Sequence, residues 1–152
     1  MSVTVRGLEG VRGLVGKDLG RSPWIDVPQE RINTFADATG DHQWIHVDLE
    51  RAAAGPFGGP IAHGYLTLSL VIPLWNELLT VEGIGMGINY GLNRVRFPAP
   101  VPAGAKVRLG ATVAEVTDVA GGVQAVVDFV VECDAVQDKP VCVAQAIYRY
   151  LA

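Results

Sequence analysis

One apolar segment decides the fold predicted for this chain: His63-Gly64-Tyr65-Leu66-Thr67-Leu68-Ser69-Leu70-Val71-Ile72-Pro73-Leu74-Trp75-Asn76-Glu77-Leu78-Leu79. If the segment is helical, apolar side chains lie all around it, so we expect a helix that is buried on every side. Proline has no amide hydrogen to donate to the carbonyl four residues earlier, so we expect Pro73 to kink the helix. The apolar stretch is shorter than the roughly 20 residues that a membrane span needs.

After this segment the pattern changes to long runs rich in valine, isoleucine and threonine, separated by turn signals. The runs predict four strands, at 85–97, 105–119, 122–134 and 140–151, with a tight hairpin turn at Gly121-Gly122. Several long antiparallel strands and one apolar helix predict an α+β fold in which a sheet wraps around the helix. No repeat or linker is visible, so we expect a single domain over residues 1–152.

The part of the chain before the apolar segment predicts shorter elements. The glycine-rich beginning allows one short helix, and 24–27 is typical of a short strand. A firmer helix begins near Pro28, follows a 3.6-residue apolar period and ends at Gly40. Asp48 predicts the start of a second short helix, over 49–54.

Composition excludes several classes of function. The formal net charge is −4 and no basic run of five or more residues occurs, which argues against a nucleic-acid partner. The N-terminus lacks a basic region followed by an apolar core, so we expect a cytoplasmic protein without a secretory signal. Cys133 and Cys142 flank a predicted hairpin; we expect reduced thiols, with a disulfide between them as the alternative.

The stretch from Ala38 to His46 contains the main candidates for chemistry. Gly40 ends a helix, so Asp41 lies on a loop, and His46 follows five positions later. A carboxylate and an imidazole held together can bind one water molecule and move its protons. Spacing alone leaves a structural alternative, in which Asp41 caps backbone amides and His46 is a hydrogen-bonded polar residue. A zinc site that includes His42 is a further alternative, which the lack of a protease-type glutamate disfavours.

Two other features are candidates for binding. Gly64 opens the apolar helix, where amides have no intrahelical partner, so its amide can polarise a substrate carbonyl; small size for packing is the alternative. Arg94 and Arg96 alternate along one predicted strand, and Lys106 and Arg108 repeat this pattern on the next. Such a cluster predicts an anion site, for example for a coenzyme A phosphate, whereas a solvated sheet face is the alternative.

Two stretches resemble the MaoC-like (R)-specific enoyl-CoA hydratases: Phe35-Ala36-Asp37-Ala38-Thr39-Gly40-Asp41-His42-Gln43-Trp44-Ile45-His46 and Ile61-Ala62-His63-Gly64. The family motif is an aromatic residue followed by Gly-Asp-x-Asn-Pro-aliphatic-His. The likeness covers nearly the whole chain, and within the family it is strongest to mycobacterial-type 3-hydroxyacyl-thioester dehydratases with a single hotdog domain. It implies the hotdog fold, in which an antiparallel sheet wraps one long buried helix.

The resemblance also implies a reaction and a role for individual residues. Asp41 and His46 are expected to be the catalytic pair that adds water to a trans-2-enoyl thioester, giving the (R)-3-hydroxyacyl product, or removes it, in fatty-acid metabolism. Which of the two is the acid and which the base stays open, because they titrate as a coupled pair. The amide of Gly64 is expected to stabilise the enolate-like oxygen, and Gln43 and His63 are expected to lie beside the substrate.

The same resemblance implies the partners of the protein. The acyl group is expected to arrive on coenzyme A or on acyl carrier protein, and the chain is expected to form a homodimer with the sheets joined edge to edge. No metal or redox cofactor is implied, because the thioester itself makes C3 electrophilic. Two residues depart from the motif, Gln43 for asparagine and Trp44 for proline, and these departures leave the size of the substrate open.

Two other classes of function remain as alternatives. A non-catalytic hotdog subunit that binds acyl thioesters within a larger complex has no need of Asp41 and His46, so their presence disfavours it. A hotdog thioesterase requires an acidic group on or near the long helix. The helix offers only Glu77, close to its C-terminal end, which makes this class the weaker alternative.

Overall fold

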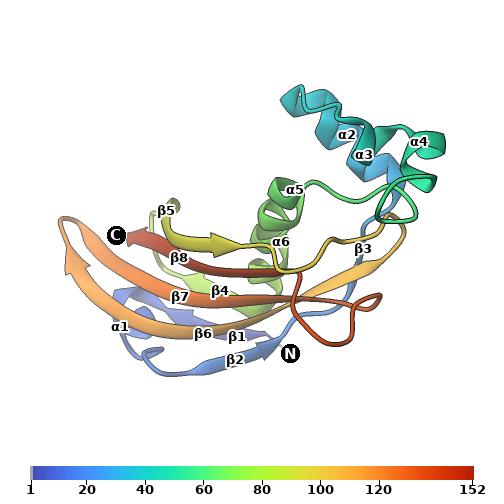
Figure 1. Ribbon diagram of the computed structural model, residues 1–152. Helices are drawn as coiled ribbons and strands as arrows, with labels where there is room; N and C mark the ends of the chain where they lie inside the picture. The colour runs from blue at the N-terminus through green and yellow to red at the C-terminus, as the bar shows by residue number, and fades with distance from the viewer. Residues whose placement is uncertain (1) are drawn as a thin grey trace.

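The computed structural model describes residues 2–152, and a strongly curved antiparallel sheet forms its body (Figure 1). Its strands lie in the order β2-β6-β7-β8-β5, and β3 adds to the outer side of β6. The bounds are β2 Asp18–Arg21, β3 Ile25–Asp26, β5 Met86–Arg96, β6 Lys106–Val119, β7 Gly122–Cys133 and β8 Cys142–Leu151. The four long strands predicted from the sequence are therefore confirmed, with small shifts at their ends.

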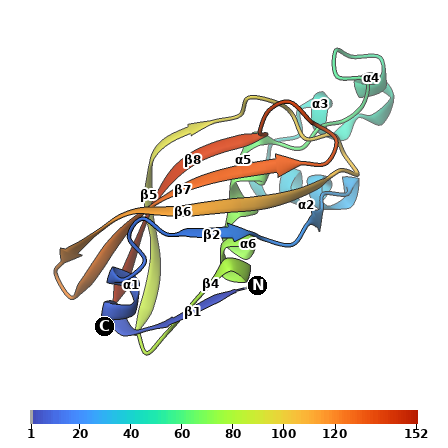
Figure 2. The same ribbon diagram turned by 90° about the horizontal axis from the view of Figure 1, so that it is seen from below.

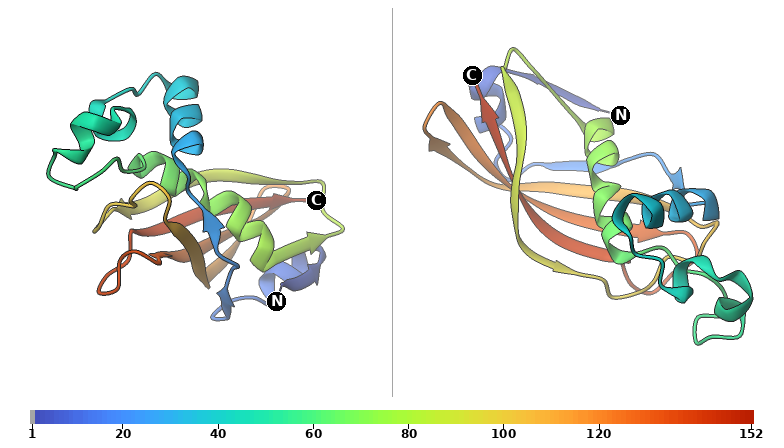
Figure 3. Two further views of the ribbon diagram at one scale, coloured as in Figure 1. Left: turned by 90° about the vertical axis from the view of Figure 1, so that its right-hand side faces the viewer. Right: turned by 90° about the horizontal axis from the view of Figure 1, so that it is seen from above.

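The predicted apolar helix crosses the concave face of this sheet, as two pieces (Figure 3). They are α5, Gly64–Ser69, and α6, Val71–Leu78, with Leu70 between them. The break has a direct cause, because the ring of Pro73 clashes with the carbonyl four residues earlier, that of Ser69. The expectation of burial on every side is wrong: Tyr65 is 73% exposed and Ile72 is 38% exposed.

The core lies between the helix and the sheet. The ring of Trp75, from α6, stacks on Tyr148 of β8 at 5.8 Å and meets the edge of Phe129 of β7 at 5.3 Å. The indole N–H of Trp75 donates to the hydroxyl of Tyr150 at 3.3 Å, so the polar atom of this buried ring has a partner. The architecture is α+β with the helix wrapped by the sheet, as predicted.

A small second sheet was not predicted from the sequence. It pairs β1, Val3–Arg6, with β4, Leu79–Glu82, in parallel, apart from the main sheet (Figure 2). The helix α1, Gly7–Arg12, follows β1 directly and agrees with the short helix expected near the N-terminus. Both strands alternate apolar and polar side chains, but each has only four residues and pairs with a segment far away in the chain, so the sequence alone gives a weak signal.

Residues 28–63 form an overhang that extends beyond one end of the sheet (Figure 1). Its helices are α2, Gln29–Thr39; α3, Trp44–Val47; and α4, Leu49–Ala53. Gly40 ends α2 in the left-handed conformation, with φ of 81°, which glycine adopts at little cost. Asp48 caps α4 by accepting the amide of Arg51, as predicted.

Backbone hydrogen bonds connect the overhang to the body of the protein. The amide of Ile61 donates to the carbonyl of Ile45, and the amide of Ala62 donates to the carbonyl of Val101. The end of the overhang is thereby held against both α3 and the connection between β5 and β6. No helix among residues 2–152 is long and apolar enough to cross a membrane.

Candidate active site

Asp41 lies on the loop between α2 and α3, directly after the helix-ending Gly40. Its side chain is exposed, and its carboxylate accepts a long backbone hydrogen bond from Gln43, at 3.4 Å. Its own amide donates to the hydroxyl of Thr39 at 3.4 Å. The carboxylate therefore retains capacity to accept further hydrogen bonds, as a group that holds a water molecule requires.

His46 is buried at 6% exposure, and the orientation of its ring is determined by a backbone contact. Its Nδ1 lies 2.7 Å from the carbonyl oxygen of Ile61, which can only accept, so Nδ1 carries the hydrogen. In the neutral ring the lone pair is then on Nε2. A second contact holds the backbone, because the side-chain amide of Gln29 donates to the His46 carbonyl at 2.7 Å.

The surroundings of His46 favour its neutral form. Burial lowers the pKa of the imidazole below its usual value of 6.5, and the neighbouring His63 lowers it further. The carbonyl of Ile61 and the charge of Asp41 act in the opposite direction, without reversing the result. Near neutral pH the ring is therefore a base with a free lone pair, ready to accept a proton.

Asp41, His46 and His63 converge, with one ligand atom from each lying within 4.8 Å of the others. A hydrogen bond between oxygen or nitrogen atoms spans about 2.8 Å, so one water molecule can bridge Asp41 and His46 across this gap. The rings of His46 and His63 are stacked, with centroids 3.9 Å apart and planes 22° from parallel. A shared metal ion fits this arrangement poorly, because the lone pairs of stacked rings lie in separate, nearly parallel planes.

Gly64 begins α5 beside this group, at the wall of an elongated cavity of about 360 Å³. His46 and Thr67 also line this cavity, together with apolar residues that include Phe57 and Phe97. A Cβ atom at position 64 would lie 3.0 Å from the ring of Phe97, so a larger residue would require this ring to shift. The first amides of α5 have no intrahelical acceptor and form the positive end of the helix dipole.

The other residues that the sequence singled out on the loop have different surroundings. Gln43 precedes α3 and is exposed, and its carbonyl accepts the amide of His46. His42 is exposed and points to Asp37 at 2.9 Å, a contact that raises the pKa of its imidazole. His42 thus lies apart from the converging group, which removes it from the predicted zinc alternative. The ring of Trp44 packs under Arg51, on the side of α4.

The predicted basic cluster on the sheet is wrong. Arg94 and Arg96 are on β5, at one edge, whereas Lys106 and Arg108 are on β6, with β8 and β7 between them. Strands that are consecutive in sequence are here not neighbours in the sheet. The residues opposite the first two arginines, Gln145 and Val143, are on the outer face, so these arginines point away from the helix and the cavity.

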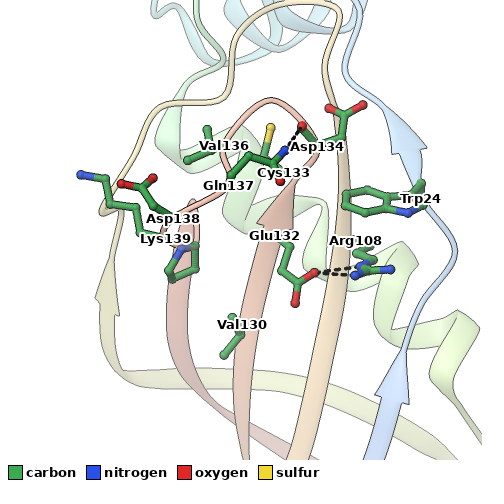
Figure 4. Close-up of a pocket in the computed structure, with 11 residues that line it drawn as sticks. Trp24, Arg108, Val130, Glu132, Cys133, Asp134, Val136, Gln137, Asp138 and Lys139 are labelled. Carbon is green, nitrogen blue, oxygen red and sulfur yellow. Dashed lines mark hydrogen bonds and ion pairs between the residues drawn. The ribbon is translucent and has the colours of Figure 1, made fainter.

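A larger hollow, of about 450 Å³, lies at the far side of the sheet between β3 and the hairpin that joins β7 to β8 (Figure 4). Two of its charged residues, Arg108 and Glu132, are paired with each other. Arg108 stacks over Trp24 at 4.4 Å and forms an ion pair with Glu132 at 2.8 Å, and Arg21 binds the same carboxylate. Burial raises the pKa of Glu132, but the two arginines outweigh it and hold this pKa below its usual value.

Three residues near Asp41 and His46 were not predicted. Gln29 holds the backbone of His46, Ile61 orients its ring, and Phe97 closes the space over Gly64. The contacts of Gln29 and Ile61 involve amide or carbonyl groups 17 and 15 residues away in the chain. No local sequence signal could have identified them, since each depends on how the overhang folds back on itself.

Comparison with known proteins shows the family of this chain. A family model of the MaoC-like domain matches residues 11–134. The 3-hydroxyacyl-thioester dehydratase Z of Mycobacterium tuberculosis is 51% identical over 150 residues, which cover 98% of this chain and 99% of that protein. The chain belongs to the MaoC-like dehydratase family. The resemblance predicted from the sequence is thereby confirmed.

Solved structures confirm the hotdog fold of this MaoC-like chain. The unliganded R-hydratase of Pseudomonas aeruginosa superposes with a TM-score of 0.72 at 25% identity, over 90% of this chain and 81% of that one. A monoamine oxidase regulatory protein from Archaeoglobus fulgidus superposes with a TM-score of 0.78 at 25% identity, over 99% and 97% of the two chains.

Proposed function

We propose that this MaoC-like chain catalyses the (R)-specific hydration of trans-2-enoyl thioesters, or the reverse dehydration of (R)-3-hydroxyacyl thioesters, in fatty-acid metabolism. The observation that carries the proposal is the pair of Asp41 and His46, with the free Nε2 of the imidazole beside the cavity that Gly64 lines. The predicted enzyme class, a hydro-lyase, is confirmed by the relation to 3-hydroxyacyl-thioester dehydratase Z along almost the entire chain.

The proposed reaction needs one water molecule and one proton relay. In hydration, Asp41 and His46 each accept one hydrogen of the bound water. As the water oxygen forms a bond to C3, the Nε2 of His46 takes one proton, and the electron pair of the C2–C3 double bond moves toward the thioester carbonyl. The imidazolium then gives this proton to C2 on the same face. The hydroxyl group and the proton of the water molecule are thus both on the product, and His46 returns to its neutral form. Asp41 orients the water and stabilises the transient imidazolium.

Negative charge develops on the thioester oxygen during this reaction, and the amide of Gly64 is placed to meet it. A backbone N–H at the beginning of a helix is a donor that needs no rearrangement when the charge appears. Gly64 lines the cavity and has no side chain to press on Phe97, and we propose that the thioester carbonyl approaches its amide there. The thioester supplies the electrophile, so we propose that the reaction uses no metal and no redox cofactor.

We propose that the acyl chain follows the helix away from the site. Beyond the cavity at Gly64 come two further hollows, of about 200 Å³ beside Leu68 and Ile72 and of about 170 Å³ beside Ile72 and Trp75. The second and third hollows share Ile72 and Tyr148. Replacing Ile72 with tryptophan is expected to slow long-chain substrates while leaving crotonyl-CoA turnover nearly unchanged. Equal effects on short and long substrates would contradict this path.

A homodimer joined through β5 is the proposed assembly. This edge strand has one unpaired side, and Met86, Ile88, Tyr90 and Leu92 on it are all exposed. Long apolar edge strands associate with other chains unless they are protected. Light scattering is expected to give twice the mass of the chain, and Tyr90→Lys is expected to reduce it to that of one chain. A monomeric wild type would contradict the proposal.

Two further features, coenzyme A contacts of Arg94 and Arg96 and a cytoplasmic location, are also proposals. Arg94 and Arg96 lie on the edge strand β5 and point to the outer face of the sheet. A coenzyme A molecule bound at the cavity would have to pass around this edge to bring its phosphates to them. A cytoplasmic location is supported by the buried, free thiols of Cys133 and Cys142. Burial raises the pKa of Cys142 to about 11, so this thiol stays protonated and unreactive.

The test is the ultraviolet absorbance of trans-2-enoyl-CoA thioesters on addition of purified protein, for crotonyl-CoA and for a longer substrate. We expect a fall with the wild type, none beyond background with Asp41→Asn, and the (R)-3-hydroxyacyl product on chiral chromatography. The (S) product would contradict the stereochemistry. A flat trace with every CoA and carrier-protein thioester would support the alternative of a non-catalytic, acyl-binding subunit.

A further inference from the structure

His63 contacts both members of the proposed catalytic pair and immediately precedes Gly64. Its Nε2 lies 2.9 Å from the backbone carbonyl oxygen of Asp41, and its ring stacks on that of His46 at 3.9 Å. On its other side the ring of Phe35 meets it at 4.9 Å with an angle of 57°. The side chain of His63 thus joins three segments that are separate in the sequence: α2, the loop that contains Asp41, and the start of α5.

The burial of His63 argues against direct contact with a substrate. Its side chain is only 2% exposed, and it is not among the residues that line the cavity beside His46. Its Nδ1 is buried and has no hydrogen-bond partner. Since a carbonyl oxygen can only accept, Nε2 must carry the hydrogen, and the neutral ring leaves the buried Nδ1 without one.

We propose that His63 is a positioning residue for the hydration reaction, which holds the carboxylate of Asp41 in register with His46 and the Gly64 amide. It acts through the hydrogen bond from Nε2 to the Asp41 carbonyl. This inference rests on the proposed function and replaces the substrate contact that the sequence predicted for His63. The other two hydrogen bonds of Asp41 itself, from its amide to Thr39 and from the Gln43 amide to its carboxylate, are long, at 3.4 Å, so the short bond from the buried ring of His63 has a large share in the placement of Asp41.

Two substitutions separate the hydrogen bond from the ring. His63→Phe keeps a flat ring between His46 and Phe35 but has no N–H to donate, whereas His63→Gln keeps a side-chain N–H at a similar reach. We expect His63→Phe to lower kcat about tenfold, the effect of losing one hydrogen bond, with KM little changed because the ring does not line the cavity. His63→Gln is expected to retain kcat within roughly threefold.

Ser22→Ala is the matched control for the loss of a buried hydrogen bond. The hydroxyl of Ser22, between β2 and β3, is buried and accepts the amide of Leu109 of β6 at 2.9 Å. We expect this variant to lower the melting temperature without changing kcat. Wild-type kcat in His63→Phe, or equal losses in His63→Phe and His63→Gln, would overturn the role of the hydrogen bond.

A second measurement is independent of catalysis. The chain has three histidines, so nitrogen NMR of the imidazole rings resolves each one. We expect the Nε2–H form at His63 and the Nδ1–H form at His46 in the wild type; Nδ1–H at His63 would overturn the proposal without any variant. Amide exchange of Asp41 and Gln43 is expected to quicken in His63→Phe but not in His63→Gln. If no thioester is turned over, the proposed function fails, and these spectra still decide whether His63 holds the loop.

Discussion

The cavity beside His46 and the hollow beside Arg108 are two concave regions of the molecule, and the larger is the one without the proposed chemistry. The hollow measures about 450 Å³ and the cavity about 360 Å³. In the hollow, both oxygens of Glu132 are bound by arginines. His46 lines the cavity with a free lone pair on Nε2, and the nearby Asp41 carboxylate accepts one long hydrogen bond, from Gln43, and keeps capacity for more.

The difference teaches that available polar groups, more than volume, mark a reactive site. A charged group that is already paired within the protein has few hydrogen bonds left to form, so a substrate gains little by binding there. A neutral, oriented imidazole beside an exposed carboxylate is the opposite case, because its capacity is directed at what enters the cavity. The comparison predicts that substitutions in the two regions have very different effects on turnover.

The largest effect is expected at the catalytic pair. Asp41→Asn and His46→Gln are each expected to lower kcat by about 10²-fold or more, since each removes acid–base assistance. The double variant is expected to be little worse than either single one, because the two groups act on the same water molecule. Turnover under substrate saturation measures this, with circular dichroism to confirm folding. Wild-type rates in both single variants would remove the distinction between cavity and hollow.

A smaller effect is expected at Gly64. The added methyl group of Gly64→Ala would lie 3.0 Å from the ring of Phe97, so the amide or the ring must shift. We expect a loss of roughly tenfold in kcat/KM, in line with partial loss of one oxyanion donor. The double variant with Phe97→Leu is expected to recover part of this loss by relieving the contact. No recovery would mean that the methyl group blocks the substrate itself.

The pH dependence of activity is expected to report His46. The base must be unprotonated to accept a proton from water, and burial lowers its pKa from 6.5. Hydration activity, as kcat/KM, is therefore expected to persist below pH 6.5 and to fall only as the pH drops through the lowered pKa. A pH profile in buffers of constant ionic strength measures this. An acidic limb above pH 6.5 would contradict the buried, neutral base.

The smallest effect is expected in the hollow. Glu132→Gln removes a carboxylate whose pKa the two arginines hold low, so the stability that it adds is present near neutral pH and is lost as the pH falls through the lowered pKa. We expect kcat within about twofold of wild type and a decrease of at most about 1 kcal/mol in the free energy of unfolding at pH 7. Urea titration at pH 7 and pH 3 measures the change. A large loss of turnover would place a functional group in the hollow after all.

The sequence predicted well those features that depend on residues close together in the chain. Gly40 as a helix end, Asp48 as a helix cap and the presence of a tight hairpin between β6 and β7 are set by local backbone preferences. The turn itself is one residue earlier than predicted, at Ala120-Gly121, because Gly122 is already paired with Val119. The spacing of Asp41 and His46 is likewise visible in the chain itself, although the structure leaves only Asp41 on the loop and places His46 in the short helix α3. The break of the apolar helix was predicted as a kink at Pro73, and the structure places it one turn earlier, at the carbonyl that the proline ring displaces.

Features that depend on strand order or on contacts between distant segments were missed. Arg94 and Lys106 belong to strands that follow one another in sequence, yet two other strands separate them in the sheet. Ile72 is exposed, although the whole apolar segment was expected to be buried. Its exposure depends on which side of the helix the sheet leaves uncovered. Alternation along one strand identifies its faces but not its neighbours, so such errors follow from the physics of sheets.

The sequence by itself determined the fold class, the family and the catalytic candidates, because periodicity, turn residues and a dense motif are all local in the chain. Tertiary structure alone decided how these candidates work. The Nδ1–H of His46 is directed to a carbonyl 15 residues away, and the Asp41 carbonyl receives an N–H from a ring 22 residues away. Hydrogen bonds of this kind form only after the overhang has folded against the body, so no local pattern encodes them.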